Sequence, residues 1–204
     1  LAFSLSSGSA LAANDKSLTR SLNKSPQVLQ RINHSASLND AFNLTPQEAL
    51  IKSKSRVDKR GFSHTRYRQT YRGIPIWGEE IIINRDQSGR ATFVNGRLIQ
   101  NLGDSLLNIM PYISANGALN TMKARVKNRS NYSNSLIFGN ESSELVIYLD
   151  AGKPKLSYAV SFFADSTIGG QPTRPTFLVN AHDGSVLFEY EGLTHVEMAT
   201  GPGG

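Results

Sequence analysis

Cysteine is absent from all 204 residues of the chain. Small exported domains often rely on disulfides, so this fold must be stabilised by its core, by a metal or by a partner. The absence also excludes thiolate metal ligands and thiol nucleophiles. Long apolar runs are missing as well, because no segment approaches the ~20 apolar residues that a membrane-spanning helix needs. We therefore expect no disulfides, and no membrane association once a leader has been removed.

Recognisable catalytic motifs are missing too. None of the four histidines (His34, His64, His182 and His195) has a second histidine three or four residues away, as a His-Glu-x-x-His zinc site requires. There is no Gly-x-Ser-x-Gly elbow, Walker loop or dinucleotide-binding glycine motif. We expect His64 to be a hydrogen-bonded strand residue and Asp183 to be a turn residue. The chain is therefore predicted to be non-catalytic and to hold no metal or cofactor of its own.

The beginning of the chain has the character of an export signal. Residues 1–13 carry no charge and include Ala10-Leu11-Ala12, the small-x-small pattern that a signal peptidase accepts. We interpret residues 1–12 as the remnant of a signal peptide cleaved between Ala12 and Ala13, followed by an N-terminal segment over 13–44. A Ser/Ala-rich terminus without a signal is the alternative. Export without cysteine predicts secretion into a bacterial periplasm or the extracellular medium.

The formal net charge is +6, and the excess is concentrated between residues 52 and 72, where Asp58 is the only acidic residue. Such a concentration favours a polyanion or an acidic protein surface as a partner. A solvated strand face is the alternative. The cations are Lys52, Lys54, Arg56, Lys59, Arg60, Arg66, Arg68 and Arg72.

Hydrophobic periodicity predicts an α+β fold of two small units, each an antiparallel sheet with a packed helix, followed by an extended C-terminal tail. In the first unit the capping box Thr45-Pro46-Gln47-Glu48 predicts a helix to about Lys54. Alternation then predicts three strands, and Ser114 is expected to begin the helix of the second unit. The predicted strands are 62–72, 76–84 and 91–99 in the first unit, and 145–149, 156–164, 176–181 and 186–191 in the second.

The predicted boundaries follow from the turn-forming residues. The first unit occupies 45–100, a linker 101–112, the second unit 113–192 and the tail 193–204. Within the second unit the helix runs over 114–126, and the Asn/Ser-rich residues 128–143 are expected to form a loop with a short strand at 136–138.

One segment resembles the fungalysin/thermolysin propeptide motif, which in outline is His-x-Arg-Tyr-x-Gln-x-Tyr-x-Gly-(Ile/Val)-Pro-Val-x-Gly. It reads His-Thr-Arg-Tyr-Arg-Gln-Thr-Tyr-Arg-Gly-Ile-Pro-Ile-Trp-Gly over residues 64–78. Residues 145–192 resemble a PepSY domain, and Ala199-Thr-Gly-Pro-Gly-Gly204 resembles the opening of a mature vibriolysin-type catalytic domain. The matching motif residues are His64, Arg66, Tyr67, Gln69, Tyr71, Gly73, Pro75 and Gly78.

This resemblance implies the prosegment of a secreted zinc metalloprotease, acting as an intramolecular chaperone and inhibitor. Its partner would be the thermolysin-like catalytic domain, covalently attached before autoprocessing and non-covalently bound afterwards, with zinc and calcium held by that domain. The motif residues would serve in docking, and no nucleic acid would be bound.

The resemblance also assigns a role to the tail. Leu193, Thr194 and His195 would lie in the protease cleft as an inhibitory segment, since thermolysin-like enzymes favour a bulky apolar residue after the cut. His195-Val196 and Glu197-Met198 both satisfy this preference, and the resemblance favours the first. After cleavage the new carboxylate of His195 would contact the protease zinc.

Two other functions compete with this hypothesis. A secreted basic module that binds a polyanion or nucleic acid would use the arginines together with Tyr67, Tyr71 and Trp77 as stacking platforms. A free-standing PepSY inhibitor is disfavoured by the Gly-Pro-Gly-Gly ending.

Overall fold

The computed structural model describes residues 18–106, 108–131 and 133–193. Within these ranges no helix combines the length and the hydropathy needed to cross a bilayer. The helices are α1 (Pro26–His34), α2 (Leu38–Phe42), α3 (Leu102–Ser105) and α4 (Ala115–Arg129), with a 3-10 turn at Ser133–Ser135. The strands are β1 (Thr19–Ser21), β2 (Glu48–Val57), β3 (Ser63–Tyr71), β4 (Ile74–Arg85), β5 (Ala91–Ile99), β6 (Leu136–Asp150), β7 (Lys153–Ser166), β8 (Pro175–Asn180) and β9 (Val186–Glu191).

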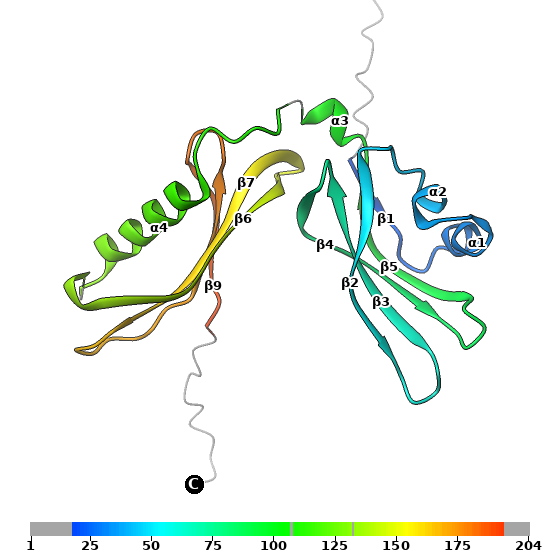
Figure 1. Ribbon diagram of the computed structural model, residues 1–204, viewed down its shortest axis with the longest axis horizontal. Helices are drawn as coiled ribbons and strands as arrows, with labels where there is room; N and C mark the ends of the chain where they lie inside the picture. The colour runs from blue at the N-terminus through cyan, green and yellow to red at the C-terminus, as the bar shows by residue number, and fades with distance from the viewer. Residues whose placement is uncertain (1–17, 107, 132, 194–204) are drawn as a thin grey trace, which may run out of the picture.

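The strands fall into two groups, β1 to β5 and β6 to β9, which face each other with helices on their outer sides (Figure 1). A single parallel pair, Ile76 of β4 with Ile147 of β6, joins the groups into one nine-stranded sheet over the described residues. The strand order is β1-β5-β4-β6-β7-β8-β9, with β3 against β4 and β2 against β3. The predicted α+β class is confirmed. The division into two units stays a prediction, because β4 pairs with strands of both groups.

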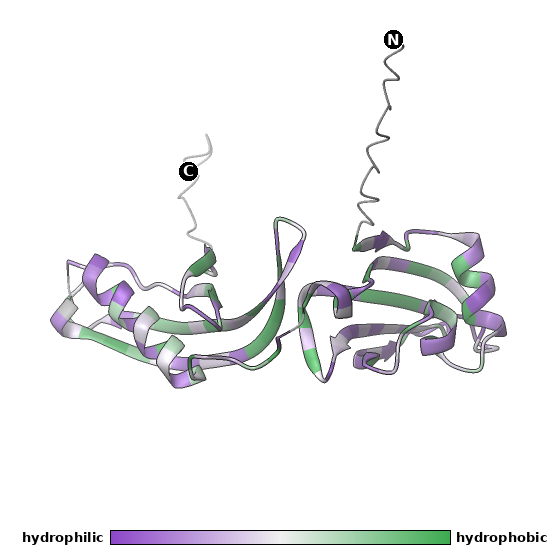
Figure 2. Ribbon diagram, turned by 90° about the horizontal axis from the view of Figure 1, so that it is seen from above, coloured by the Kyte–Doolittle hydropathy of each residue, from purple (hydrophilic) through white to green (hydrophobic). Residues whose placement is uncertain are grey.

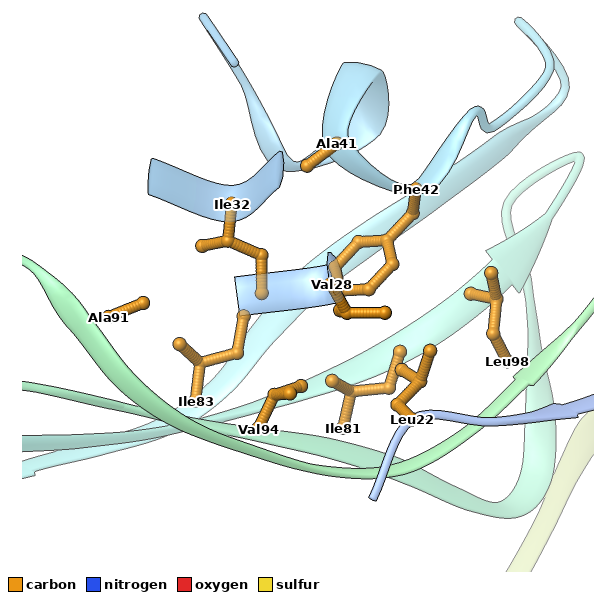
Figure 3. Close-up of a cluster of buried hydrophobic side chains, with 10 residues drawn as sticks. All are labelled: Leu22, Val28, Ile32, Ala41, Phe42, Ile81, Ile83, Ala91, Val94 and Leu98. Atoms are coloured by element: carbon orange, nitrogen blue, oxygen red, sulfur yellow. The ribbon is translucent and has the colours of Figure 1, made fainter. Parts of the chain in front are cut away.

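Helices α1 and α2 cover the first group of strands. Helix α1 begins at Pro26 because proline is tolerated at the first helical position, and the Ser25 hydroxyl accepts a bond from the Val28 amide at 3.4 Å. Its apolar face meets β4 and β5 in the core shown in Figure 3. That core contains Leu22, Val28, Ile32, Ala41, Phe42, Ile81, Ile83, Ala91, Val94 and Leu98.

Helix α4 covers the second group and confirms the predicted helix beginning after Ser114. The Ser114 hydroxyl accepts from the Gly117 amide at 3.0 Å, and Ala118 and Met122 turn towards the strands. Apolar residues lie mainly on the strands, whereas the helices are largely hydrophilic (Figure 2). The predicted apolar face of β7 is buried in this core and consists of Leu156, Tyr158, Val160 and Phe162.

The helix predicted from the capping box is wrong. The local contact does form, because the Glu48 carboxylate accepts from the Thr45 amide at 3.0 Å and from the Thr45 hydroxyl at 2.9 Å. The chain then leaves the turn as strand β2, which pairs with β3 along its whole length. Pairing with a neighbouring strand outweighs a local helix signal here, because helix propensity is only a weak preference.

Two further segments differ from expectation. The second half of the loop predicted over 128–143 is strand, and it extends well beyond the short strand expected at 136–138, because β6 begins at Leu136 and its first residues pair with the far end of β7. The predicted linker 101–112 also contributes to a core. It contains α3, and Leu102 and Leu106 are buried beside Tyr71 and Ile99.

Candidate functional site

The motif residues lie on the hairpin of β3 and β4. This hairpin turns through Arg72 and Gly73, which both have positive φ (49° and 80°), between the paired residues Tyr71 and Ile74. Two successive positive φ angles are typical of a type I′ turn, whose twist suits an antiparallel hairpin. Glycine is the residue that adopts this conformation without strain, which explains Gly73 of the motif.

Gln69 closes a gap that β4 leaves in the first group of strands. The register of β3 with β4 shifts between Arg68 and Thr70, where β4 bends away to pair through Ile76 with the second group. The buried Gln69 amide donates to the Ile99 carbonyl at 2.6 Å and accepts from the Ile99 amide at 2.9 Å. The side chain thus supplies to β5 the two hydrogen bonds that a strand backbone would otherwise make.

The two motif tyrosines face inward. Tyr71 is buried beside Ile76 and Leu102, and its hydroxyl lies 3.4 Å from Oε1 of Gln47. Tyr67 is partly buried against the first core. Tyr71 therefore does not form the exposed stacking platform that nucleic-acid binding would need.

His64 lies next to the turn of the β2–β3 hairpin and is hydrogen-bonded, as expected. Its Nε2 lies 3.1 Å from Oδ2 of Asp58, while the other carboxylate oxygen accepts from the amides of Arg60 and Phe62. The hydrogen bond from His64, followed by that from the Phe62 amide, lowers the pKa of Asp58 below its ordinary value. In the described part of the chain no group of three His, Asp or Glu side chains is arranged to hold a metal.

Four cations form what we call the basic face: Lys54, Arg56, Arg66 and Arg68. The pairing of β2 with β3 shifts between Lys52 and Lys54, which places Lys54 opposite Arg66 and Arg56 opposite His64. Arg66 makes an ion pair with Glu80 at 2.8 Å. Among the described residues, no carboxylate pairs with Lys54, Arg56 or Arg68.

A cavity of about 460 Å³ lies where the two groups of strands meet. Trp77 lines this cavity and packs on Val146, Ala159 and Leu178 of the second group. The cavity therefore combines apolar walls with charges of both signs. Its lining is Arg68, Pro75, Ile76, Trp77, Gly78, Glu79, Glu80, Glu144, Val146 and Tyr190.

The tail leaves the second group from β9. Oε1 of Glu191 accepts from the amides of Arg174 and Leu193 at 2.7 and 2.9 Å, which sets the direction in which the chain leaves the strand. Of the predicted tail site, Leu193 is described. Thr194, His195, Val196 and Glu197-Met198 lie outside the described residues, as do Ala12 and Ala13 of the predicted signal cleavage.

Comparison with known proteins identifies the family to which this hairpin is similar. Residues 48–98 match the Fungalysin/Thermolysin Propeptide Motif. The matched range extends from the first residue of β2 almost to the end of β5, so it contains nearly the whole meander, including Gln69. The match confirms the resemblance to a thermolysin-family protease propeptide, whereas the PepSY resemblance of 145–192 stays a prediction.

Curated relatives of the chain are bacterial proteases. It is 29% identical over 181 residues to "Neutral protease" of Vibrio proteolyticus, covering 85% of this chain and 29% of that protein. It is 30% identical over 155 residues to "Virulence metalloprotease" of Vibrio anguillarum, covering 74% and 25%. It is 29% identical over 166 residues to "Hemagglutinin/proteinase" of Vibrio cholerae, covering 80% and 26%. The chain spans less than a third of the length of these relatives.

Proposed function

We propose that this chain is the prosegment of a secreted, thermolysin-like zinc endopeptidase, and that it acts as a folding template and then as an inhibitor of the catalytic domain. The match of residues 48–98 to the propeptide motif carries this proposal. The similarity to three bacterial proteases, each much longer than the matched part, supports it. Zinc and calcium would be held by the catalytic domain, while this chain supplies a binding surface.

The motif serves the proposed function mainly through architecture. Tyr71 and Gln69 fix the β3–β4 hairpin from inside and Gly73 forms its turn, whereas Arg66 and Arg68 remain on the surface. A surface held by buried residues before binding loses little conformational entropy when it docks, which favours a template function. The exposed cations would speed association with an acidic protein face.

The tail would complete the inhibition. A segment leaving β9 at Leu193 is well placed in sequence to enter the cleft of a bound protease as an extended substrate strand. Cleavage between His195 and Val196 would leave a new carboxylate at His195. A carboxylate is a suitable zinc ligand at a position that water otherwise occupies, so the cut prosegment would remain bound as a product.

Refolding in trans tests the proposal. The catalytic domain of the cognate precursor is unfolded, diluted with and without an equimolar amount of this chain, and assayed for peptide hydrolysis. We expect activity to recover only with the chain and to fall again when the chain is in excess. Equal recovery without the chain, or no inhibition by an excess, would contradict the proposal. Serum albumin at the same concentration controls for non-specific protection.

A polyanion-binding module is the second candidate. The unpaired cations Lys54, Arg56 and Arg68 favour it, whereas the burial of Tyr71 does not. Binding to heparin or single-stranded DNA that falls steeply with salt, together with no effect on protease refolding, would support this function.

A further inference from the structure

Strand β2 is a free edge of the first group of strands. It pairs with β3 on one side, and no other described strand pairs with it on the opposite side. Residues 51–57 are exposed, and Figure 1 shows the β2–β3 hairpin extending away from α1 and α2 to the turn that joins its two strands. Such an edge presents a row of backbone N–H and C=O groups that another extended chain can pair with.

The edge of β2 carries exposed apolar side chains as well as charges. Lysine on an edge strand discourages pairing between copies, and one or two charges suffice for that purpose. Here Ile51 and Val57 are 53% and 65% exposed on the same strand. Exposed apolar side chains on an edge favour pairing, because they can pack on the side chains of an added strand.

The irregularity at Ser53 decides where the cations point. The register shift between Lys52 and Lys54 puts Lys54 and Arg56 on the same face as Arg66, directly opposite Arg66 and His64. If Ser53 were paired with Arg66 in a regular ladder, the alternation of the strand would turn both cations to the face of Tyr67. Glu80 compensates the charge of Arg66, whereas Lys54 and Arg56 have no carboxylate partner among the described residues.

We propose that residues 52–57 of β2 accept an extended segment of the catalytic domain as an added strand, with two carboxylates two residues apart opposite Lys54 and Arg56. Side chains two residues apart share a face of a strand, so this spacing matches the two cations. The carboxylates compensate the charges of Lys54 and Arg56, while the backbone of the segment pairs with the free edge. This inference rests on the proposed function and specifies its partner chemistry.

A peptide of about ten residues that alternates Glu with Thr is the probe. The intact chain is titrated with it, and amide hydrogen exchange and NMR shifts are followed along β2. We expect protection of amides 52–57 and a dissociation constant at least about fivefold lower than for a peptide of the same composition with its Glu residues in one block. Equal binding of the two peptides would contradict an added strand.

Paired variants separate the edge from general electrostatics. K54S/R56S removes the two cations of the edge, and K59S/R60S removes two from the turn of the same hairpin. We expect at least about fivefold weaker peptide binding for the first pair and less than about twofold for the second. Equal losses for the two paired variants would contradict the proposal.

Two further measurements complete the test. Tighter binding of oligothymidylate than of the alternating peptide, without protection of β2, would overturn the proposal in favour of a phosphate polymer. In the refolding assay, undiminished inhibition by K54S/R56S would also overturn it, while leaving the chaperone function intact. Failure of the unmodified chain in that assay would instead refute the proposed function.

Discussion

Replacement of Gln69 by leucine isolates the energetic contribution of the bridge between β3 and β5. Leucine has a similar size and removes both hydrogen bonds to Ile99, at 2.6 and 2.9 Å. The Ile99 amide and carbonyl then stay buried without partners, and each such group costs roughly 1–3 kcal/mol. We therefore expect the free energy of unfolding to fall by about 2–5 kcal/mol. This is a large part of the 5–15 kcal/mol typical of a domain.

Urea titration followed by tryptophan fluorescence provides the assay. Trp77 is the only tryptophan and packs at the junction of the two groups of strands, so its emission reports on the region next to the bridge. The exposed Gln30 of α1 is the matched control, because its replacement by leucine makes the same chemical change with an expected effect within about 0.5 kcal/mol. A loss below about 1 kcal/mol for Q69L, with an unchanged urea dependence, would refute the bridge as a stabilising feature.

A second variant at position 69 tests the direction in which stability changes with pH. Glutamate can still accept from the Ile99 amide, but its ionised form cannot donate to the Ile99 carbonyl. Burial disfavours the charged form and raises the pKa of such a carboxyl above its unfolded value. Q69E should therefore be least stable at neutral pH and should recover stability as the pH falls through the folded pKa, because the protonated acid can donate.

Three further predictions follow from other features. G96A should lower the free energy of unfolding by more than about 2 kcal/mol, because the new Cβ would lie 2.2 Å from a backbone carbonyl oxygen of β4 at a φ of 125°; a smaller loss in urea titration would be inconsistent with this close approach. The lowered pKa of Asp58 means that the hairpin end is stable above the ordinary carboxyl pKa and loses stability as the pH falls through the folded value. The NMR shift of the Phe62 amide checks this loss, and H64A should reduce it. Replacing Val196 by Gly or Asp in the full precursor should slow autoprocessing at least about tenfold, since a methylene in an apolar pocket changes kcat/KM by about 10–200-fold. Cleavage of the same bond at an unchanged rate would exclude it as the preferred site.

The strands could be predicted from the sequence wherever alternation was regular. The alternation over residues 62–72 puts Tyr67, Gln69 and Tyr71 on one face of the strand, and that face is the inner one. The capping box at Thr45 and Glu48 predicted a contact that exists, but the continuation depended on the long-range pairing with β3, which no local pattern records. The same reason explains Leu136, which becomes strand because β7 is long enough to pair with it.

The candidate site could be predicted less completely. The excess of positive charge near Lys54 and Arg66 is visible in the sequence, but its distribution between two faces depends on the register shift that skips Ser53 in β2. The function of Gln69 could not be predicted, because it arises only when β4 leaves the first group of strands. Alternating patterns describe regular strands and contain no signal for the point at which a strand changes its neighbour.

The change of neighbours along β4 also affects how the chain would be inactivated by proteolysis. β4 hydrogen-bonds to β3 and β5 and, through Ile76, to β6. Scission of the backbone near Gly78 would therefore take a shared strand from the first group and the Trp77 cover from the second. Under the proposed function, a single cut in this strand would remove both halves of the binding surface, and the bound protease would be released abruptly rather than in stages.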